Sequence, residues 1–297
     1  MKQLILGIVL IATVAFVARG ADGDLFPYPT PPDDMTMLDE RCSFLVSHFW
    51  ERCDLKSAMS AKEKLHNTFG DWVSFMPYAH ADTVHLAIEN LLSKVTKNDK
   101  IVLGLARMAE AWTYSDTTEM FSEEIYLPFA KAVAEHRKIS SVDRARFERH
   151  VQIIENSSLG SVVKHLDCVK IDGSQLTIDD LRTQIIVLAF SSYDCDACTL
   201  SRVRLSADIN ANALIRAGLL TIAYIEQGEP SDEWKMAAAS YPEDWIIAAS
   251  PDADFYFDLR DSQGIYLLDA RHKVLAKNID IDKLLYILAS LRANTRL

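Results

Sequence analysis

Apolar and polar residues follow two different periods along this chain, and the change of period falls near residue 157. Between about residues 37 and 156, apolar positions recur every three or four residues, as in Leu38, Cys42 and Leu45. This spacing places them on one face of a helix, and no strand-like alternation interrupts it. The segment is therefore predicted to be a domain of several short helices.

Local signals predict where some of these helices begin and end. Ser60 and Glu63 have the spacing of a capping box, and Pro77 is expected to end the helix that follows. One helix is expected to run through both Cys42 and Cys53. Their sulfur atoms would then be separated by about 16 Å of helix rise, which is too far for a disulfide. Both cysteines are interpreted as small core residues.

From about residue 160 onward, apolar runs alternate with helical patterns. The continuous runs Ile185–Phe190 and 219–225 are typical of strands buried on both faces. Other strands are expected at residues 162–171, 175–178, 245–248, 264–269 and 273–276, and helices at 195–205, 210–216, 231–240 and 281–291. Small polar residues at 156–161 are interpreted as a linker between the halves. The sequence thus predicts an α+β chain of two domains, an all-α domain at 37–156 and an α/β domain at 160–297.

The beginning of the chain has the pattern of an export signal. Lys2 precedes an apolar run from residue 4 to residue 17, and the small residues Ala18 and Gly20 precede a cleavage site before Ala21. An uncleaved membrane anchor is the alternative, although the run is short for a spanning helix. We expect a signal peptide at residues 1–20, a proline-rich leader at 21–36, and export with the periplasm as the destination.

The charge of the chain limits its partners. The formal net charge is −11, and it becomes −13 if residues 1–20 are removed together with Lys2 and Arg19. No basic run accompanies this negative charge, which argues against binding to nucleic acid or to an anionic membrane surface. Contact with a membrane is expected only through the signal segment, if it stays uncleaved.

The candidate reactive residues follow the strand predicted at Ile185–Phe190, at the beginning of the next predicted helix. Cys195-Asp196-Ala197-Cys198 follows that strand after a polar turn. Free N–H groups at the start of the helix would stabilise a thiolate on Cys195, and Cys198 lies one turn away, within reach of a disulfide. Such a motif in an α/β pattern is typical of a redox site. A zinc half-site, which would need two more ligands, and a pair of inert buried thiols are the alternatives.

Residues 160–297 resemble the thioredoxin fold, and in particular its exported TlpA/ResA-like branch. The resemblance rests on the hairpin His165–Ile178, the strand that leads into the C-x-x-C motif, and the segment 256–279. Residues 37–156 resemble a helical domain of unknown function that precedes such modules in some exported bacterial proteins.

This resemblance implies a thiol–disulfide oxidoreductase that acts on protein thiols and disulfides and on an upstream redox partner. Cys195 would attack and Cys198 would resolve the mixed disulfide. The family needs neither a cofactor nor a metal for this chemistry.

The chain departs from the family pattern around the motif. Asp194 precedes Cys195 where the family usually has an aromatic residue, and Tyr193 lies one position earlier. Gln263 occupies the place of the family's cis-proline, and a cis bond before it would cost about 2.5–4 kcal/mol, so we expect a trans bond. Ser201 and Val203 replace an acidic residue and a proline of the family pattern.

These departures bear on binding and reactivity. Tyr193, Asp194, Asp196 and Gln263 are the expected substrate-contacting residues. The two carboxylates beside Cys195 disfavour its thiolate, so we expect a near-normal or raised pKa for that thiol unless both carboxylates are screened by solvent. A near-normal or raised pKa of the attacking thiol is typical of a reductase-like or weakly active site. A protein of a different class is the main alternative, namely a scaffold whose thioredoxin-like module has become inactive and whose helical domain recruits a partner.

Overall fold

The computed structural model of this protein describes residues 25–259 and 263–295. The predicted signal peptide lies outside these residues, and the proline-rich leader lies partly outside them. The chain forms two compact units, residues 1–129 and 130–297. The division falls within helix α6, upstream of the boundary that the sequence predicts. No helix of the described residues is long and apolar enough to cross a membrane.

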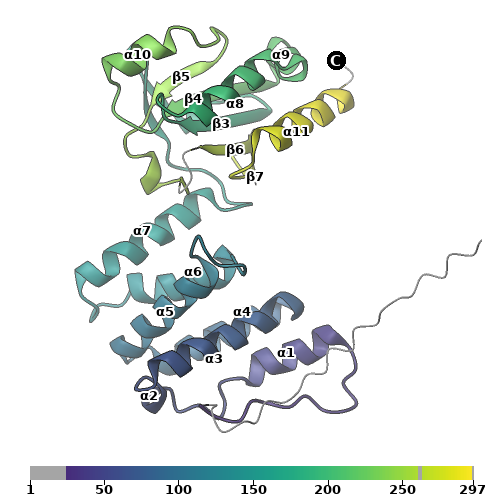
Figure 1. Cartoon of the computed structure of the whole chain (residues 1–297), viewed down its shortest axis with the longest axis vertical. Helices are drawn as coiled ribbons and strands as arrows, with labels where there is room; N and C mark the ends of the chain where they lie inside the picture. Colours follow the sequence, from purple (N-terminus) through teal and green to yellow (C-terminus); the bar gives the residue numbers. More distant parts are fainter. Residues whose placement is uncertain (1–24, 260–262, 296–297) are drawn as a thin grey trace, which may run out of the picture. The chain divides into compact units, whose positions relative to one another are not determined.

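The first unit is helical, as the apolar period predicts (Figure 1). Its elements are α1 (Leu38–His48), α2 (Leu55–Ala58), α3 (Lys62–Phe75), the 3-10 turn η1 (Met76–Tyr78), α4 (Ala81–Val95), α5 (Asp99–Thr113) and the first part of α6 (Glu123–Ala134). Asn98 caps α5, since its side chain accepts a hydrogen bond from the N–H of Ile101 at 3.3 Å. Pro77 lies in η1, directly after α3, as expected of a helix-ending proline.

Two local predictions in this unit are wrong. Ser60 does not cap α3, because its hydroxyl donates instead to the carbonyl oxygen of Ser57 at 2.8 Å, and α3 begins at Lys62. Helix α1 ends at His48, so Cys53 lies beyond it and is only half-buried. The chain turns after His48, and this turn buries the aromatic rings of both Phe49 and Trp50.

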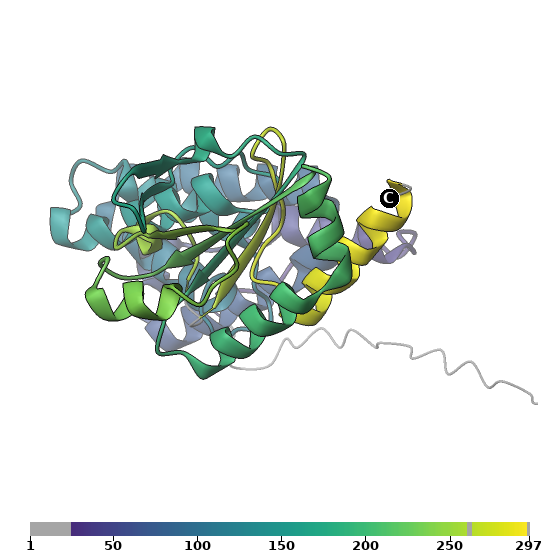
Figure 2. The ribbon, with the colours of Figure 1, turned by 90° about the horizontal axis from the view of Figure 1, so that it is seen from above.

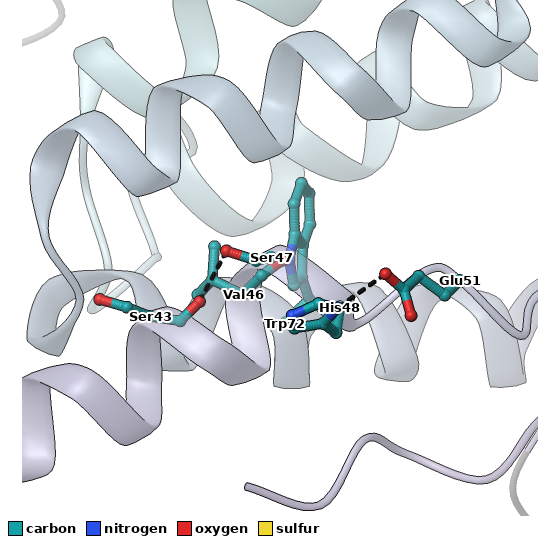
Figure 3. Close-up of polar contacts among 6 residues, drawn as sticks. All are labelled: Ser43, Val46, Ser47, His48, Glu51 and Trp72. Carbon is teal, nitrogen blue, oxygen red and sulfur yellow. Dashed lines mark hydrogen bonds and ion pairs between the residues drawn. The ribbon is translucent and has the colours of Figure 1, made fainter. Parts of the chain in front are cut away.

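An aromatic cluster fills the first unit and ties its helices together. Trp72 is fully buried, and its indole N–H donates to the carbonyl oxygen of Val46 at 3.0 Å, which joins α3 to α1 (Figure 3). Nearby on the solvent side, His48 contacts Glu51 at 2.7 Å. Gly70 lets helix α5 approach closely, because a Cβ there would lie 2.4 Å from the Trp112 ring.

The second unit is an α/β domain in which one sheet forms the centre (Figures 1 and 2). After the end of α6, its elements are α7 (Ser141–Ser157), β1 (Asp167–Lys170), β2 (Gln175–Thr177), η2 (Ile178–Asp180), β3 (Ile185–Ser191), α8 (Asp196–Ala207), α9 (Ile209–Arg216), β4 (Leu220–Glu226), α10 (Asp232–Ala238), β5 (Ile246–Ala249), η3 (Ala253–Phe255), β6 (Gly264–Asp269), β7 (Val274–Ala276) and α11 (Ile281–Asn294). The strand order is β2-β1-β5-β4-β3-β6-β7. β3 is parallel to β4 and antiparallel to β6.

Strand β3 lies in the middle of the sheet and is covered on both faces, which explains its unbroken apolar run. Val187 and Ala189 pack against residues of α8, α9 and α11. Figure 2 shows these helices, in green and yellow, along one side of the sheet. Ile186, Leu188 and Phe190 point to the other face. The C-terminal end of β3 therefore holds the turn that leads into α8 in a fixed position.

The join between α7 and the sheet differs from the expected linker. Asn156 and Ser157 end helix α7, and both are buried. The Asn156 side-chain oxygen accepts from the N–H groups of Lys164 and His165 at 2.9 and 3.0 Å, and its amide donates to the carbonyl oxygen of Tyr256 at 3.0 Å. The expected strand from residue 162 is also shorter than predicted and begins at Asp167. The reason is that Lys164 and His165 bond to Asn156 rather than to a neighbouring strand.

Candidate functional site

The C-x-x-C motif lies at the C-terminal end of β3 and at the beginning of α8. Cys195 is the N-cap residue of α8, and its Sγ accepts a hydrogen bond from the N–H of Cys198 at 3.1 Å. The two sulfur atoms are joined in a disulfide, with the Cα atoms 5.2 Å apart. Cys195 is partly exposed whereas Cys198 is fully buried. Solvent therefore reaches the residue Cys195 but not Cys198.

The residues that flank the disulfide are exposed. Tyr193 is 42% exposed, and Asp194 and Asp196 also lie in solvent. The hydroxyl of Ser192 donates a hydrogen bond to the Asp194 carboxylate, which holds that side chain within the turn. The expected effect of both carboxylates on the pKa of the reduced Cys195 thiol stays a prediction.

A buried carboxyl group behind this turn was missed by the sequence analysis. Glu226 ends β4, pairs with Ser191 of β3 and is 5% exposed. Burial raises the pKa of its carboxyl from 4.5 to about 7, and repulsion from Asp194 adds to this, whereas a hydrogen bond from the Tyr193 N–H opposes it. The only sequence signal is an acidic residue at the end of a continuous apolar run.

Two aromatic side chains contact helix α8, which carries the disulfide. Tyr224 of β4 is 4% exposed, and its hydroxyl donates to the carbonyl oxygen of Cys198 at 3.3 Å. The ring of Tyr241 lies 4.1 Å from the guanidinium carbon of Arg202 in α8, a cation–π contact. These contacts fix the first turn of α8, and with it the buried cysteine.

Gln263 is brought next to the same helix. It directly precedes β6, whose Gly264 pairs with Phe190 near the end of β3. The buried hydroxyl of Ser201, one turn after Cys198 on α8, donates to the Gln263 side-chain oxygen at 3.0 Å. The structure thus places Gln263 beside α8, but it describes neither Ser262 nor the bond between the two, so the expected trans bond there stays a prediction.

The remaining cysteines are not part of the disulfide. Cys42, Cys53 and Cys168 are free thiols. Burial raises the pKa of Cys53 to about 11 and that of Cys168 to about 12, so both stay protonated and unreactive near neutral pH. Within residues 25–259 and 263–295, no three His, Cys, Asp or Glu side chains gather closely enough to hold a metal ion.

The fold and the motif define the class of this protein: it has a thioredoxin-like domain with its C-x-x-C motif at the head of α8, preceded by a helical region. It is similar over 89% of its length to a thioredoxin-like protein from Bacteroides caccae, of which it covers 98%, with 21% identity and a TM-score of 0.67. This likeness confirms the predicted fold.

The chain also matches one domain family and further solved structures. Residues 11–157 match the model of a family described as a domain of unknown function, DUF5106. The thioredoxin domain of a thiol-disulfide oxidoreductase from Bacteroides vulgatus is 21% identical, with a TM-score of 0.39, over 45% of this chain and 97% of that one. No curated protein matches the chain.

Proposed function

We propose that this protein is an exported thiol–disulfide oxidoreductase that exchanges disulfides with partner proteins through Cys195 and Cys198. The observation that carries the proposal is the disulfide at the N-terminus of α8, in which Cys195 is partly exposed and Cys198 is fully buried. This arrangement separates an attacking thiol from a resolving one. The names of the similar proteins from Bacteroides agree with this chemistry.

The proposed reaction balances as two thiol exchanges. The Cys195 thiolate attacks one sulfur of a substrate disulfide, forms a mixed disulfide and releases the other substrate sulfur as a thiolate. The Cys198 thiolate then attacks the Cys195 sulfur, which releases the second substrate thiolate and leaves the Cys195–Cys198 disulfide. Two electrons pass to the substrate, and an upstream dithiol protein returns them to the chain. The reverse sequence would oxidise a substrate.

Two features give the neighbouring residues their proposed roles, and a third supports export. Tyr193, Asp194 and Asp196 are exposed around Cys195, where a substrate polypeptide would lie. Gln263 is held beside α8 by Ser201 and would contact the same polypeptide. The apolar run near the beginning of the sequence supports export, and an oxidising compartment would make the paired cysteines useful.

A scaffold protein with an inactive module is the second candidate. The departures at Asp194 and Gln263 favour it, because they alter the positions that surround the attacking thiol in active relatives. In that case the helical unit would be the functional surface, and Cys195 and Cys198 would only stabilise the fold.

A redox titration separates the two candidates. The purified protein is equilibrated in glutathione or dithiothreitol buffers, and its free thiols are alkylated and counted by mass. We expect a single two-electron transition confined to Cys195 and Cys198, and insulin reduction that is lost in Cys195→Ser but retained in Cys53→Ser. Independent alkylation of the two thiols, or insulin reduction equal to that of Cys195→Ser, would refute the oxidoreductase and favour the scaffold.

A further inference from the structure

The helical unit has an open apolar groove that the disulfide chemistry does not use. Its volume is about 1000 Å³. It is formed by α1, by the end of α3 with η1, by α4, and by the segment 119–125 at the beginning of α6; Figure 1 labels these helices. We call it the α1–α4 groove. Its floor consists of buried side chains: Cys42, Val73, Met76, Val84 and Ile88.

Large apolar side chains line the groove and remain in contact with water. Leu38 from α1 is 53% exposed, Tyr78 from η1 is 58% exposed, and Phe121 is 43% exposed. An apolar patch of this kind on a folded unit is typical of an interaction surface. The three side chains come from three separate segments, so a ligand that covers them all must present several apolar groups in succession. A polypeptide does this with side chains spaced along one face.

The charges around the groove specify the partner further. Two carboxylates, Glu119 and Glu124, line the groove together with His85, and no Lys or Arg of the described chain lines it. Next to Leu38, the Asp39 carboxylate lies 3.6 Å from His80. Glu124 also contacts His85 at 2.7 Å, and the groove lining still carries more carboxylates than basic side chains. Such a rim favours a cationic partner and repels an anionic one.

We propose that the α1–α4 groove binds an amphipathic, cationic polypeptide segment, with apolar side chains on the floor and Lys or Arg at the acidic rim. The segment belongs to an incompletely folded protein, and its capture increases the concentration of that protein's disulfide near Cys195. Binding itself needs no thiol chemistry. Only the identification of the ligand as a redox substrate rests on the function proposed above.

The test uses two fluorescent peptides with the same leucines, one with Lys and the other with Glu at the intervening positions. Fluorescence anisotropy measures their binding to the purified protein. We expect the Lys peptide to bind about tenfold tighter or more than the Glu peptide, and less tightly as salt is added. Leu38→Ser and Phe121→Ser should each weaken binding severalfold. Leu86→Ser is the matched control, because Leu86 is 58% exposed on α4 but does not line the groove.

Three results would overturn the proposal: no binding of either peptide, equal binding of both, or the same affinity in Phe121→Ser as in Leu86→Ser. Circular dichroism verifies that each variant is folded. The substrate role has its own readout, because Phe121→Ser should raise KM for a disulfide-bonded Lys/Leu peptide and leave the rate with a small disulfide unchanged. Unchanged KM would refute substrate capture. A wild-type protein that binds the peptide but reduces no disulfide would refute the oxidoreductase alone.

Discussion

Replacing Glu226 by glutamine should change how the stability of this protein depends on pH. The Glu226 carboxyl is 5% exposed, and burial raises its pKa from 4.5 to about 7. Between these two pH values the folded state therefore binds more protons at this site than the unfolded state. Stability must then fall as pH rises through this window. The contribution is fully present below about pH 4.5 and is lost above about pH 7.

The size of the effect follows from the same pKa. A rise from 4.5 to about 7 corresponds to at most about 3 kcal/mol in the free energy of unfolding. We therefore expect an effect of about 1–3 kcal/mol. Glutamine keeps an oxygen that can accept the Tyr193 N–H but has no charge to bury. The variant should therefore lose this pH dependence while its fold is preserved.

The assay is urea unfolding of the oxidised protein, followed by tryptophan fluorescence, between about pH 4 and pH 8. Relative to the wild type, Glu226→Gln should gain stability as pH rises. Glu229→Gln is the control, because that carboxylate is exposed in the loop after β4. If the stability curves of the wild type and Glu226→Gln stay parallel across this range, Glu226 is not a buried titrating group and the reasoning is wrong.

Three further substitutions test other contacts. Asn156→Ala should lower the free energy of unfolding by about 2–4 kcal/mol in urea, because the buried Asn156 side chain bonds to the N–H groups of Lys164 and His165, and Asn156→Asp should not restore it, because a buried carboxylate oxygen would face the Tyr256 carbonyl oxygen. Gly70→Ala should cost about 1–3 kcal/mol in thermal unfolding, because its Cβ would lie 2.4 Å from the Trp112 ring; an unchanged Tm would contradict this packing. Ser201→Ala should slow insulin reduction severalfold by releasing Gln263, whereas Ser206→Ala, whose hydroxyl bonds only within α8, should not.

The sequence predicted the elements whose signals are local. The continuous run of β3 and the motif that opens α8 are contained in a short segment, so their positions were predicted to within a residue or two. Local signals failed where a competing contact was stronger. Ser60 bonds to Ser57 rather than to the helix it precedes, and α1 ends early because Phe49 and Trp50 turn into the core.

What the sequence determined by itself is the order of elements and the pair of cysteines, because periodicity and a motif are properties of neighbouring residues. Only the tertiary structure determined which of the two cysteines is partly exposed, that Glu226 is buried and accepts from the Tyr193 N–H, and that Ser201 contacts Gln263. It also produced the α1–α4 groove from three distant segments. The physical reason is that burial and hydrogen bonding depend on atoms that the chain brings together from positions far apart in the sequence, which no local pattern encodes.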